Sequence, residues 1–430
     1  MNKILGFFKK IIPSSIFKFF QPAYHYLLAV LGNIFFGSFS EEVFVVGVTG
    51  TKGKTTTVEL INEILEKNGE KTALLSSVYK KIGDKREKKD SLNTMPGRWY
   101  IPKFLKKAVE AGCSYVILEV SSQGVEQFRH KFIDWNAAIF LNLHPEHIES
   151  HGSFEKYREA KVRFFESLKK SKAGTKYFLV NKDDENSLYF EEAVEDIPDS
   201  DKKVVRFSID DIYKTVEEIK EKEEAPDWLY SEFNLENLAA AVSFSKLRGV
   251  QHQVIFDAVK NFEGLPGRLE FITKKPYSVV VDYAHTPDSL RGLYKNLREN
   301  YNMAEDGRLI CVLGSAGGGR DKWKRPEMGK IAANYGDIVI LTSEDPYQED
   351  PMAIINDIKE GMNQTSEEPR RLVEEPDRRK AIELAIYEAK IGDVVAITGM
   401  GSQSWFHGKD GKIAWDEAGI AKEIFDKYNE

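Results

Sequence analysis

Residues 48–57 read Val-Thr-Gly-Thr-Lys-Gly-Lys-Thr-Thr-Thr, between an apolar segment that predicts a strand and a segment that predicts a helix. Backbone N–H groups from Gly50 to Lys54 can surround phosphate oxygens, helped by the helix N-terminus. The Lys54 ammonium would offset the charge of the β- and γ-phosphates, and the Thr55 hydroxyl would reach Mg²⁺. The glycine spacing departs from the general GxxxxGK[ST] motif, because position 48 is Val. A purely structural tight turn is the alternative, and Gly-Lys-Thr-Thr at the helix start favours a nucleotide site over it.

Glu119 ends the apolar run 115–118, which predicts another strand. A carboxylate at the end of a strand can hold Mg²⁺ beside bound phosphates. A buried carboxylate without a partner is costly, so we expect a cation next to Glu119. Alone, the residue is equally compatible with a core position; the phosphate loop in the same domain favours the metal role.

Three histidines fall within residues 142–152, which read Asn-Leu-His-Pro-Glu-His-Ile-Glu-Ser-His-Gly. Zinc binding is disfavoured, because neither an HExxH pattern nor a cysteine accompanies them. A single histidine in such a loop is more often a capping or core residue. By itself, Lys161 in the helix-like stretch 157–161 is interpreted as a surface lysine.

Alternating strand and helix patterns position these residues. Strands are expected at 43–48, 115–120 and 137–141, and helices at 55–67, 101–111, 154–168 and 233–247. A charged, weakly periodic region covers 183–227. The alternation is typical of a mostly parallel sheet covered by helices.

The sequence Gly264-Leu265-Pro266-Gly267 predicts a turn at a domain boundary. Beyond it, a second α/β series is expected, with strands at 278–281, 309–313, 338–341 and 394–397. We therefore expect a helical segment over residues 1–42, a central domain over 43–265 and a C-terminal domain over 266–430. Ligands of such sheets bind beyond the carboxyl ends of the strands.

The overall composition excludes some classes of protein. The net charge of the 430 residues is −7, which argues against a nucleic-acid partner that would require a basic face. The two cysteines, Cys113 and Cys311, lie far apart in apolar runs and predict buried thiols in a reducing compartment.

The first 40 residues differ from the rest. They contain Lys3, Lys9, Lys10 and Lys18, no acidic residue, and many aromatic side chains. The apolar run 23–36 is shorter than the ~20 residues that a spanning helix needs. Two interpretations stay open: an amphipathic segment that contacts an anionic membrane face, or a helical arm packed on the protein's own body.

Together, four segments resemble the Mur ligases. They are the run 50–57, Glu119-Val-Ser-Ser, the histidine block leading to Ala160-Lys161, and Val281-Asp282-Tyr283-Ala284-His285-Thr286-Pro287-Asp288. The resemblance runs from about Val43 to the C-terminus and is closest to the UDP-N-acetylmuramoyl-tripeptide synthetase branch. It implies an α/β fold, with a central P-loop-type ATPase domain on a mostly parallel sheet and a Rossmann-like C-terminal domain.

The resemblance also assigns roles to individual residues. It implies that the catalytic residues are Lys54, Glu119, His147 and Lys161, and that the Mg²⁺ site includes Thr55, Glu119, His147 and a Lys161 carbamylated by CO₂. It implies that ATP is bound by Gly50, Thr51, Lys52, Gly53, Lys54, Thr55, Thr56, Asn234, Asn237, Arg268, Asp282 and His285. It implies that the substrates are bound by Asn93, Thr94, Ser121, Gln127, Arg129, Arg320, Asp345, Tyr347 and Gln403.

The function implied by the resemblance is that of an ATP-dependent ligase, of the class that joins acids and amino acids. A carboxylate of a muramoyl peptide would attack the γ-phosphate, and an amino acid would then attack the acyl phosphate. The expected setting is peptidoglycan synthesis, hence cell-wall biogenesis, shape and division, in the cytoplasm with a peripheral contact at the inner membrane face.

This sequence departs from the family pattern at three places. Residues 1–40 stand where the family has a domain that grips a uridine nucleotide, so another protein grips it, the acceptor is held through its peptide alone, or the acceptor is membrane-anchored. The Asp-Asn-Pro-Arg motif of diaminopimelate enzymes is Glu344-Asp345-Pro346-Tyr347 here, and Gly-x-Gly-His-Glu is Gly399-Met400-Gly401-Ser402-Gln403. Tyr347 and Gln403 cannot clamp the distal ends of diaminopimelate as ions, whereas Arg320 could still hold an α-carboxylate.

Two other functions remain as alternatives. One is a different ligase of the same superfamily, similar to folylpolyglutamate or cyanophycin synthetases. The other is a non-catalytic nucleotide-binding scaffold at the membrane. Lys54, Glu119, His147 and Lys161 together argue against the scaffold.

Overall fold

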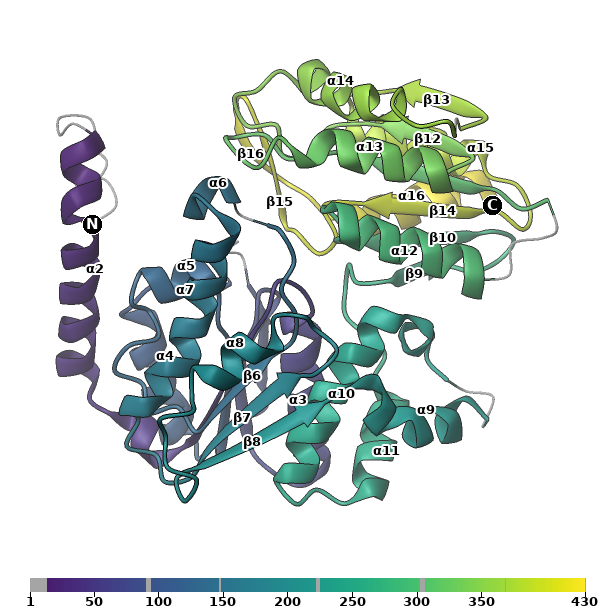
Figure 1. The fold of residues 1–430 in the computed structure, drawn as a ribbon. Coiled ribbons are helices and arrows are strands. Elements are labelled where there is room, and N and C mark those ends of the chain that lie inside the picture. Colours follow the sequence, from purple (N-terminus) through teal and green to yellow (C-terminus); the bar gives the residue numbers. More distant parts are fainter. Residues whose placement is uncertain are drawn as a thin grey trace. The chain divides into compact units, whose positions relative to one another are not determined.

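The computed structural model describes residues 14–89, 94–146, 148–221, 225–301, 306–367 and 369–429. These residues form two compact units (Figure 1). Unit 1 comprises the described residues within Met1–Pro145, His151–Glu221 and Glu236–Lys260, and unit 2 those within Glu146–Ser150, Lys222–Leu235 and Asn261–Glu430.

Unit 1 is built on an eight-stranded sheet of order β4-β3-β2-β5-β1-β6-β7-β8. The strands are β1 Phe44–Thr49, β2 Thr72–Leu75, β3 Tyr79–Ile82, β4 Lys85–Lys88, β5 Tyr115–Glu119, β6 Ala137–Phe140, β7 Lys176–Asn181 and β8 Lys202–Phe207. Pairing is parallel from β2 to β8 across the sheet, and only β3 and β4 pair antiparallel. The central strands are buried on both faces, which is why they read as continuous apolar runs.

Helices cover this sheet. They are α3 Lys54–Lys67, α4 Tyr100–Glu110, α5 Ser122–Glu126, α7 Phe154–Ser167, α8 Ser187–Glu192 and α9 Tyr213–Lys220. The helices α6 Ile148–His151, α10 Glu232–Leu247 and α11 His252–Asn261 lie where the chain passes between the two units. The helix α3 packs on β1, β2 and β5, and its N-terminus therefore lies at the carboxyl end of β1.

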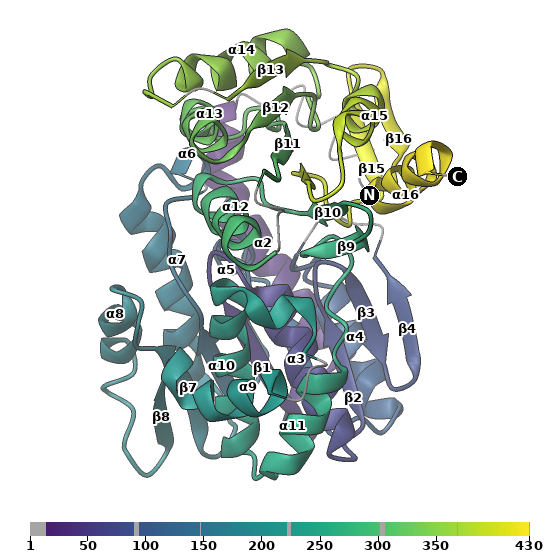
Figure 2. The ribbon, with the colours of Figure 1, turned by 90° about the vertical axis from the view of Figure 1, so that its right-hand side faces the viewer.

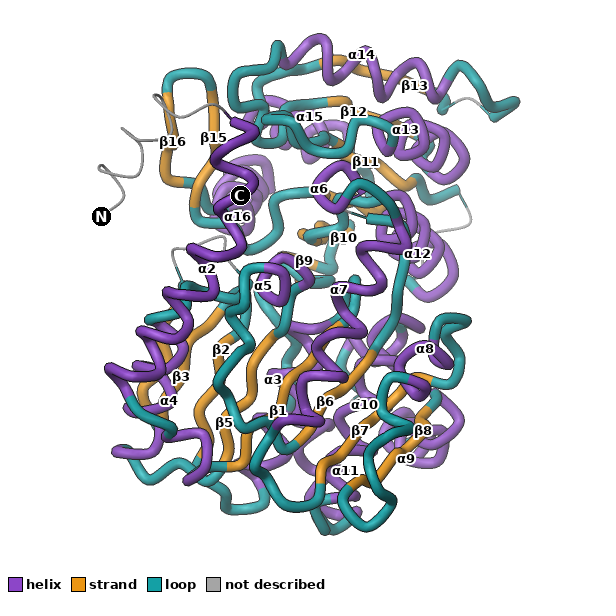
Figure 3. Tube along the Cα trace, turned by 60° about the vertical axis from the view of Figure 1, so that its left-hand side comes forward, coloured by secondary structure: helices purple, strands orange, loops and turns teal. Residues whose placement is uncertain are grey.

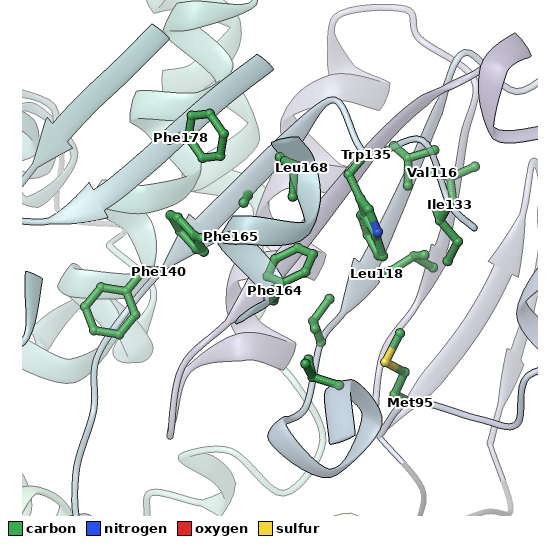
Figure 4. Close-up of a cluster of buried hydrophobic side chains, with 14 of the residues drawn as sticks. Met95, Val116, Leu118, Ile133, Trp135, Phe140, Phe164, Phe165, Leu168 and Phe178 are labelled. Atoms are coloured by element: carbon green, nitrogen blue, oxygen red, sulfur yellow. The ribbon is translucent and has the colours of Figure 1, made fainter. Parts of the chain in front are cut away.

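The core of unit 1 is rich in aromatic side chains (Figure 4). Trp135 and Phe164 meet edge to face, with ring centroids 5.0 Å apart. A Cβ on Gly47 in β1 would lie 2.3 Å from the Phe164 ring and 2.9 Å from Trp135. Glycine at position 47 therefore lets this aromatic pair lie directly on β1, just before the phosphate loop.

The N-terminal helix expected from the sequence is present as α2, Ser14–Phe36. It packs beside α4 within unit 1 (Figure 3). Among the described residues, no helix combines the length and apolarity needed to cross a bilayer.

Unit 2 contains a six-stranded sheet of order β13-β12-β11-β14-β10-β9 and a separate hairpin. The strands are β9 Glu270–Thr273, β10 Ser278–Asp282, β11 Leu309–Leu313, β12 Ile338–Leu341, β13 Arg371–Glu374 and β14 Val394–Thr398, with β15 Trp405–Gly408 and β16 Gly411–Ala414 in the hairpin. Only β9 pairs antiparallel within the six-stranded sheet.

Both faces of the unit 2 sheet are covered (Figure 2). The helices are α12 Pro287–Asn300, α13 Lys324–Tyr335, α14 Pro351–Met362, α15 Arg378–Glu388 and α16 Glu417–Asn429. The first three share one apolar cluster with the sheet, and the last two share another. The expected fold class, an α/β protein with a mostly parallel sheet and a second α/β domain, is confirmed.

Some elements were not predicted. The charged, weakly periodic region 183–227, for which no element was predicted, contains α8, β8 and α9. The strand β8, Lys-Lys-Val-Val-Arg-Phe, lies at the edge of the sheet and is only partly buried, so its sequence lacks an apolar run. The edge strand β4 was missed for the same reason, since it is fully exposed. The four-residue strand β2 was also missed, although it is fully buried.

Candidate active site

The phosphate loop joins β1 to α3. Gly50 has φ 157° and Gly53 has φ 81°, values that favour glycine. Gly53 is the N-cap of α3, and no side chain caps the helix there. A Cβ on Gly53 would lie 1.8 Å from Oδ1 of Asn237 in α10. The loop therefore requires glycine for its conformation and its packing, and it presents the first-turn N–H groups of α3, which have no partner within the helix.

The chain after β6 holds the loop in place. The backbone N–H of Thr51 donates to the carbonyl of Asn142 (2.9 Å), and that of Lys52 donates to the Asn142 side chain (2.9 Å). The Thr51 hydroxyl is 3.0 Å from the Tyr157 hydroxyl on α7. Asn142 and Tyr157 were not singled out from the sequence; the position of Asn142 directly after a strand is the one available signal.

Two lysines converge on the loop. Nζ of Lys54 donates to the carbonyls of Gly50 and Thr51, both at 2.8 Å. Nζ of Lys161 donates to the same Gly50 carbonyl at 2.7 Å and lies 4.7 Å from the centre of the Tyr157 ring. Lys161 is only 2% exposed, so its interpretation as a surface lysine is wrong.

Glu119 lies beside the start of α3. Its Oε1 accepts hydrogen bonds from the Thr55 hydroxyl (2.9 Å) and the Ser77 backbone N–H (2.5 Å), and its Oε2 accepts one from the Ser77 hydroxyl (3.0 Å). Because Glu119 is 2% exposed, these donors satisfy a carboxylate that would otherwise be costly to bury. The Ser77 hydroxyl also lies 3.1 Å from the Thr94 hydroxyl, which brings one predicted substrate-binding residue next to Glu119.

A second buried carboxylate, Glu59, lies one turn along α3 from Thr55. It accepts from the Ser76 hydroxyl (3.1 Å) and pairs with Arg86 (3.0 Å). Burial raises the pKa of Glu59 to about 7, although Arg86 acts in the opposite direction. Burial likewise lowers the pKa of Lys89, near Glu119, to about 8. Sequence reasoning missed this group; an acidic residue on an otherwise buried helix face is the signal that could have found it.

The remaining predicted residues of unit 1 fall into several groups. Ser121 caps α5 by accepting from the Gly124 N–H (3.2 Å). Oε1 of Gln127 accepts from both Arg98 (3.0 Å) and Arg129 (2.7 Å). Asn93 and His147 lie outside the described residues. Within the described ranges, no group of three or more His, Cys, Asp or Glu side chains is arranged to hold a metal ion.

The two asparagines predicted near adenine lie one turn apart on α10 but have different contacts. Asn237 packs on Gly53, and its Oδ1 is 3.5 Å from the Thr57 hydroxyl. Asn234 donates to the carbonyl of Trp228 (3.1 Å) and is 5% exposed, so it stabilises the local chain.

In unit 2, the predicted ATP residues surround Tyr283. The Arg268 guanidinium lies 4.5 Å from the centre of the Tyr283 ring, and the His285 ring is also 4.5 Å from it. Asp282 accepts from the backbone N–H groups of Leu269 and Ala284, each at 2.7 Å. Burial raises the pKa of Asp282, with Arg268 opposing the change.

The predicted donor residues of unit 2 come from three neighbouring loops. Oδ1 of Asp345 accepts from the His407 backbone N–H (2.7 Å), and the Tyr347 ring stacks on the His407 ring at 5.0 Å. A Cβ on Gly318 would lie 2.8 Å from the Tyr347 ring. Glycine at position 318 therefore lets the Tyr347 ring pack against the segment that precedes Arg320. Asp345 and Tyr347 have φ of 41° and 53°, which places the predicted site on strained backbone.

Burial acts to lower the pKa of Arg320, but Tyr283, Tyr347 and Glu344 outweigh it and raise the pKa of this guanidinium. Oε1 of Gln403 and Oε2 of Glu344 are buried and have no hydrogen-bond partner among the described residues. The three loops therefore combine a positive guanidinium with buried polar oxygens.

The residues of unit 1 fit a magnesium nucleotide. Gly50 and Gly53 leave space that side chains would fill, and the N-terminus of α3 and Lys54 supply positive charge for phosphates. The Thr55 hydroxyl and the Glu119 carboxylate are oxygen ligands of the kind that Mg²⁺ prefers.

Two family descriptions match this chain: Mur ligase middle domain over residues 48–245, and Mur ligase, glutamate ligase domain over residues 267–401. A UDP-N-acetylmuramoyl-L-alanyl-D-glutamate--2,6-diaminopimelate ligase of Syntrophomonas wolfei is 34% identical over 407 residues, covering 92% of this chain and 81% of that protein. A solved structure of a ligase with the same name has a TM-score of 0.57 and 27% identity, covering 90% of this chain and 79% of that one. A folylpolyglutamate synthase of Mycobacterium tuberculosis, solved with ADP and AMPPCP, has a TM-score of 0.67 at 15% identity and covers 93% and 95%, which shows the fold alone.

With these matches, the fold and the phosphate loop define a ligase that joins a carboxylate to an amine at the expense of ATP. The chain belongs to the Mur ligase family, whose members use ATP and Mg²⁺ in peptidoglycan synthesis.

Proposed function

We propose that this protein adds an amino acid to the carboxylate of a muramoyl peptide, through an acyl phosphate. The observation that carries the proposal is the grouping of Lys54, Thr55 and Glu119 at the end of β1, together with the family membership. The domain boundaries proposed near residues 42 and 265 assign this group to the central domain.

The residues of unit 1 would have separate tasks. The N-terminus of α3 and Lys54 bind and orient the phosphates of ATP, and Asn237 supports the loop through Gly53. Thr55, Glu119, His147 and Lys161 would hold Mg²⁺, which would supply positive charge beside the γ-phosphate. Thr94, Ser121, Gln127 and Arg129, with Asn93, hold the acceptor.

The chemistry requires two displacements. In the first, an oxygen of the acceptor carboxylate attacks the γ-phosphorus, and ADP leaves. In the second, the amine of the donor attacks the acyl carbon, phosphate leaves and a proton is lost to give the amide. Arg320 would bind the α-carboxylate of the donor, near Asp345, Tyr347 and Gln403.

Lys161 would act as its carbamate. A carbamate carries a negative charge and two oxygens, so it can orient Mg²⁺, which an ammonium cannot do. Support comes from the burial of Lys161 and from its position on the same Gly50 carbonyl as Lys54. Both lysines therefore lie at the phosphate loop.

We also propose a peripheral membrane contact through residues 1–40. The supporting observations are the lysines and the lack of acidic residues in this segment, and the exposed apolar side chains of α2.

Phosphate release tests the ligase proposal. Wild-type protein with ATP, Mg²⁺, a muramoyl-dipeptide acceptor and a panel of amino acids should release phosphate with at least one amino acid, which identifies the donor. Glu119→Gln should lower this rate roughly 100-fold, the typical effect of removing one electrostatic group at a reacting centre. The control Glu63→Gln changes a more exposed acid on α3 and should retain the rate.

Absence of phosphate release with every acceptor and amine would favour the scaffold. Release with a pteroyl acceptor and glutamate, but with no muramoyl peptide, would move the chain to another branch of the superfamily.

A further inference from the structure

The helix α2 packs against the segments that carry Arg98 and Phe128, the residue before Arg129. A Cβ on Gly32 of α2 would lie 2.8 Å from the Arg98 carbonyl, so the helix backbone approaches closely there. One turn and a half earlier, Tyr26 meets the Phe128 ring edge to face, with centroids 5.6 Å apart. His25, on the same helix, is close enough to both arginines for their charges to lower its pKa.

The two arginines form a pair around one amide. Arg98 donates from Nε to the Gln127 carbonyl (2.9 Å) and from Nη2 to the Gln127 side-chain oxygen (3.0 Å). Arg129 donates to the same side-chain oxygen (2.7 Å) and also to the carbonyl of Met95. No carboxylate of the described residues lies within 4.0 Å of either guanidinium.

No carboxylate of the described ranges pairs with either arginine. Burial, and then the neighbouring Arg129, lower the pKa of Arg98 to about 10, and burial lowers the pKa of Arg129. Burial also lowers the pKa of His25 to about 4, so its ring is neutral at pH 7 and the positive charge is that of the guanidiniums. The Arg129 Nε is buried and has no partner in the described part of the chain. Two guanidiniums held side by side, with donors to spare, suit an anion such as phosphate.

The outward side of α2 is apolar. Phe20, Leu27 and Ile34 recur every seven residues and are 61%, 55% and 70% exposed. Because seven residues make almost two helical turns, these side chains share one stripe. No acidic residue occurs in the helix, and Lys3, Lys9 and Lys10 precede it in the sequence, outside the described residues.

We propose that Arg98 and Arg129 bind a phosphate group of the acceptor beside α2, and that the acceptor is a muramoyl peptide linked through this phosphate to a membrane lipid. The inference rests on the proposed function, since it specifies the acceptor of that reaction. In this arrangement the apolar stripe of α2 contacts an anionic bilayer. Gly32, Tyr26 and His25, on the same helix, lie next to the segments of the arginine pair. A nucleotide-linked acceptor would bind the arginines, but contact of the stripe with a bilayer would not strengthen its binding. This difference distinguishes a nucleotide phosphate from a lipid phosphate.

The first experiment compares three acceptors: the muramoyl dipeptide without phosphate, its nucleotide-diphosphate form, and its lipid-diphosphate form in vesicles with 30% anionic lipid. The kcat/KM should be highest for the lipid form, by at least tenfold. Arg98→Gln should lower kcat/KM for the lipid form at least tenfold through KM, whereas Arg98→Lys should recover part of the loss. Arg206→Gln, which removes an exposed arginine of β8, is the matched control and should have no effect.

The second experiment measures binding without turnover. Vesicles that carry the lipid-diphosphate acceptor should bind the wild-type protein more tightly than vesicles without it, and Arg98→Gln should abolish this difference. Leu27→Glu with Ile34→Glu should lower binding to both kinds of vesicle, whereas Leu188→Glu, at a residue 60% exposed on α8, should not. Thermal unfolding of each variant reports on folding.

The outcomes separate the two claims. If the wild type turns over the nucleotide-linked acceptor as well as the lipid-linked one and Leu27→Glu with Ile34→Glu changes neither, the inference is wrong and the ligase function stands. If the binding difference appears but no acceptor supports phosphate release, the arginine pair binds the lipid diphosphate, but the ligase function is wrong and the lipid is not its acceptor.

Discussion

At the scale of single residues, two lysines of the phosphate loop differ in how they can be recognised. Lys54 and Lys161 both donate to the backbone carbonyl of Gly50, although they lie 4 and 111 residues from it in the sequence. Lys54 follows the glycines of the loop and could be recognised from spacing. Lys161 has no such local context and was named only through the family resemblance; the structure adds its burial and its contact with the loop.

Lys161→Ala should lower phosphate release roughly 100-fold, because a group that orients the metal would be lost. Added bicarbonate should not restore the rate, since alanine has no amine to carbamylate. Lys156→Ala is the matched control, because Lys156 is an exposed lysine of the same helix, α7. Wild-type rates in Lys161→Ala would refute the carbamate role.

At the scale of elements, α3 combines a binding terminus with a buried acidic side chain. Its first turn faces the phosphate loop, and one turn later Glu59 is fully buried beside Ser76 and Arg86. The pKa of Glu59 is about 7 in the folded protein and 4.5 in its ordinary state. The folded protein therefore holds this proton between pH 4.5 and 7 while the unfolded chain releases it.

The difference in pKa between the folded and unfolded states makes the stability of the fold depend on pH. A raised folded-state pKa stabilises the fold below pH 4.5, and this contribution is lost as pH rises to about 7. Glutamine at position 59 cannot ionise, so the Glu59→Gln variant does not lose this stability as pH rises. The unfolding free energy of the variant minus that of the wild type should therefore increase between pH 5 and 8, by at most roughly 3 kcal/mol. Thermal and urea unfolding at several pH values measure the change, with Glu63→Gln as the control. A constant difference across this range would contradict the burial of an ionisable Glu59.

At the scale of the whole molecule, two units with separate cores carry different parts of the proposed chemistry. Unit 1 contains the phosphate loop, Glu119, Lys161 and the acceptor residues, together with α2. Unit 2 contains Arg268, Asp282 and Arg320, with the loops of Tyr347 and Gln403. The proposed ligase site thus uses residues of both units, whereas the proposed membrane contact uses the N-terminal segment alone.

Deleting residues 1–36 should abolish binding to anionic vesicles and leave ATP binding intact, because the contacts of α2 are with α4, Arg98 and Phe128 and not with the phosphate loop. Vesicle sedimentation and equilibrium binding of an ATP analogue measure the two effects. Binding of the full-length protein should also weaken with salt, since the attraction is partly electrostatic. Equal sedimentation of both forms would remove the membrane contact.

The sequence by itself determined the α/β class, the phosphate loop, and seven of the buried strands: β1, β5, β6, β10, β11, β12 and β14. These features depend on local patterns: continuous apolar runs, glycine spacing, and the residues that open a helix. The same reasoning missed the edge strands β4 and β8, because exposed edge strands bury too little surface to leave an apolar run. It also missed β2 and β7, although these strands are mostly buried.

The tertiary structure decided which distant residues meet. It placed Asn237 against Gly53, Tyr157 and Lys161 at the loop, and Ser77 on Glu119, across separations of up to 184 residues that no local pattern encodes. It also showed that α2 packs on unit 1, as the interpretation of a helical arm expected, while Phe20, Leu27 and Ile34 stay exposed. The membrane contact remains a proposal. The sequence specifies which side chains are present. The burial and proximity that change a pKa or build a binding site arise only when the chain folds.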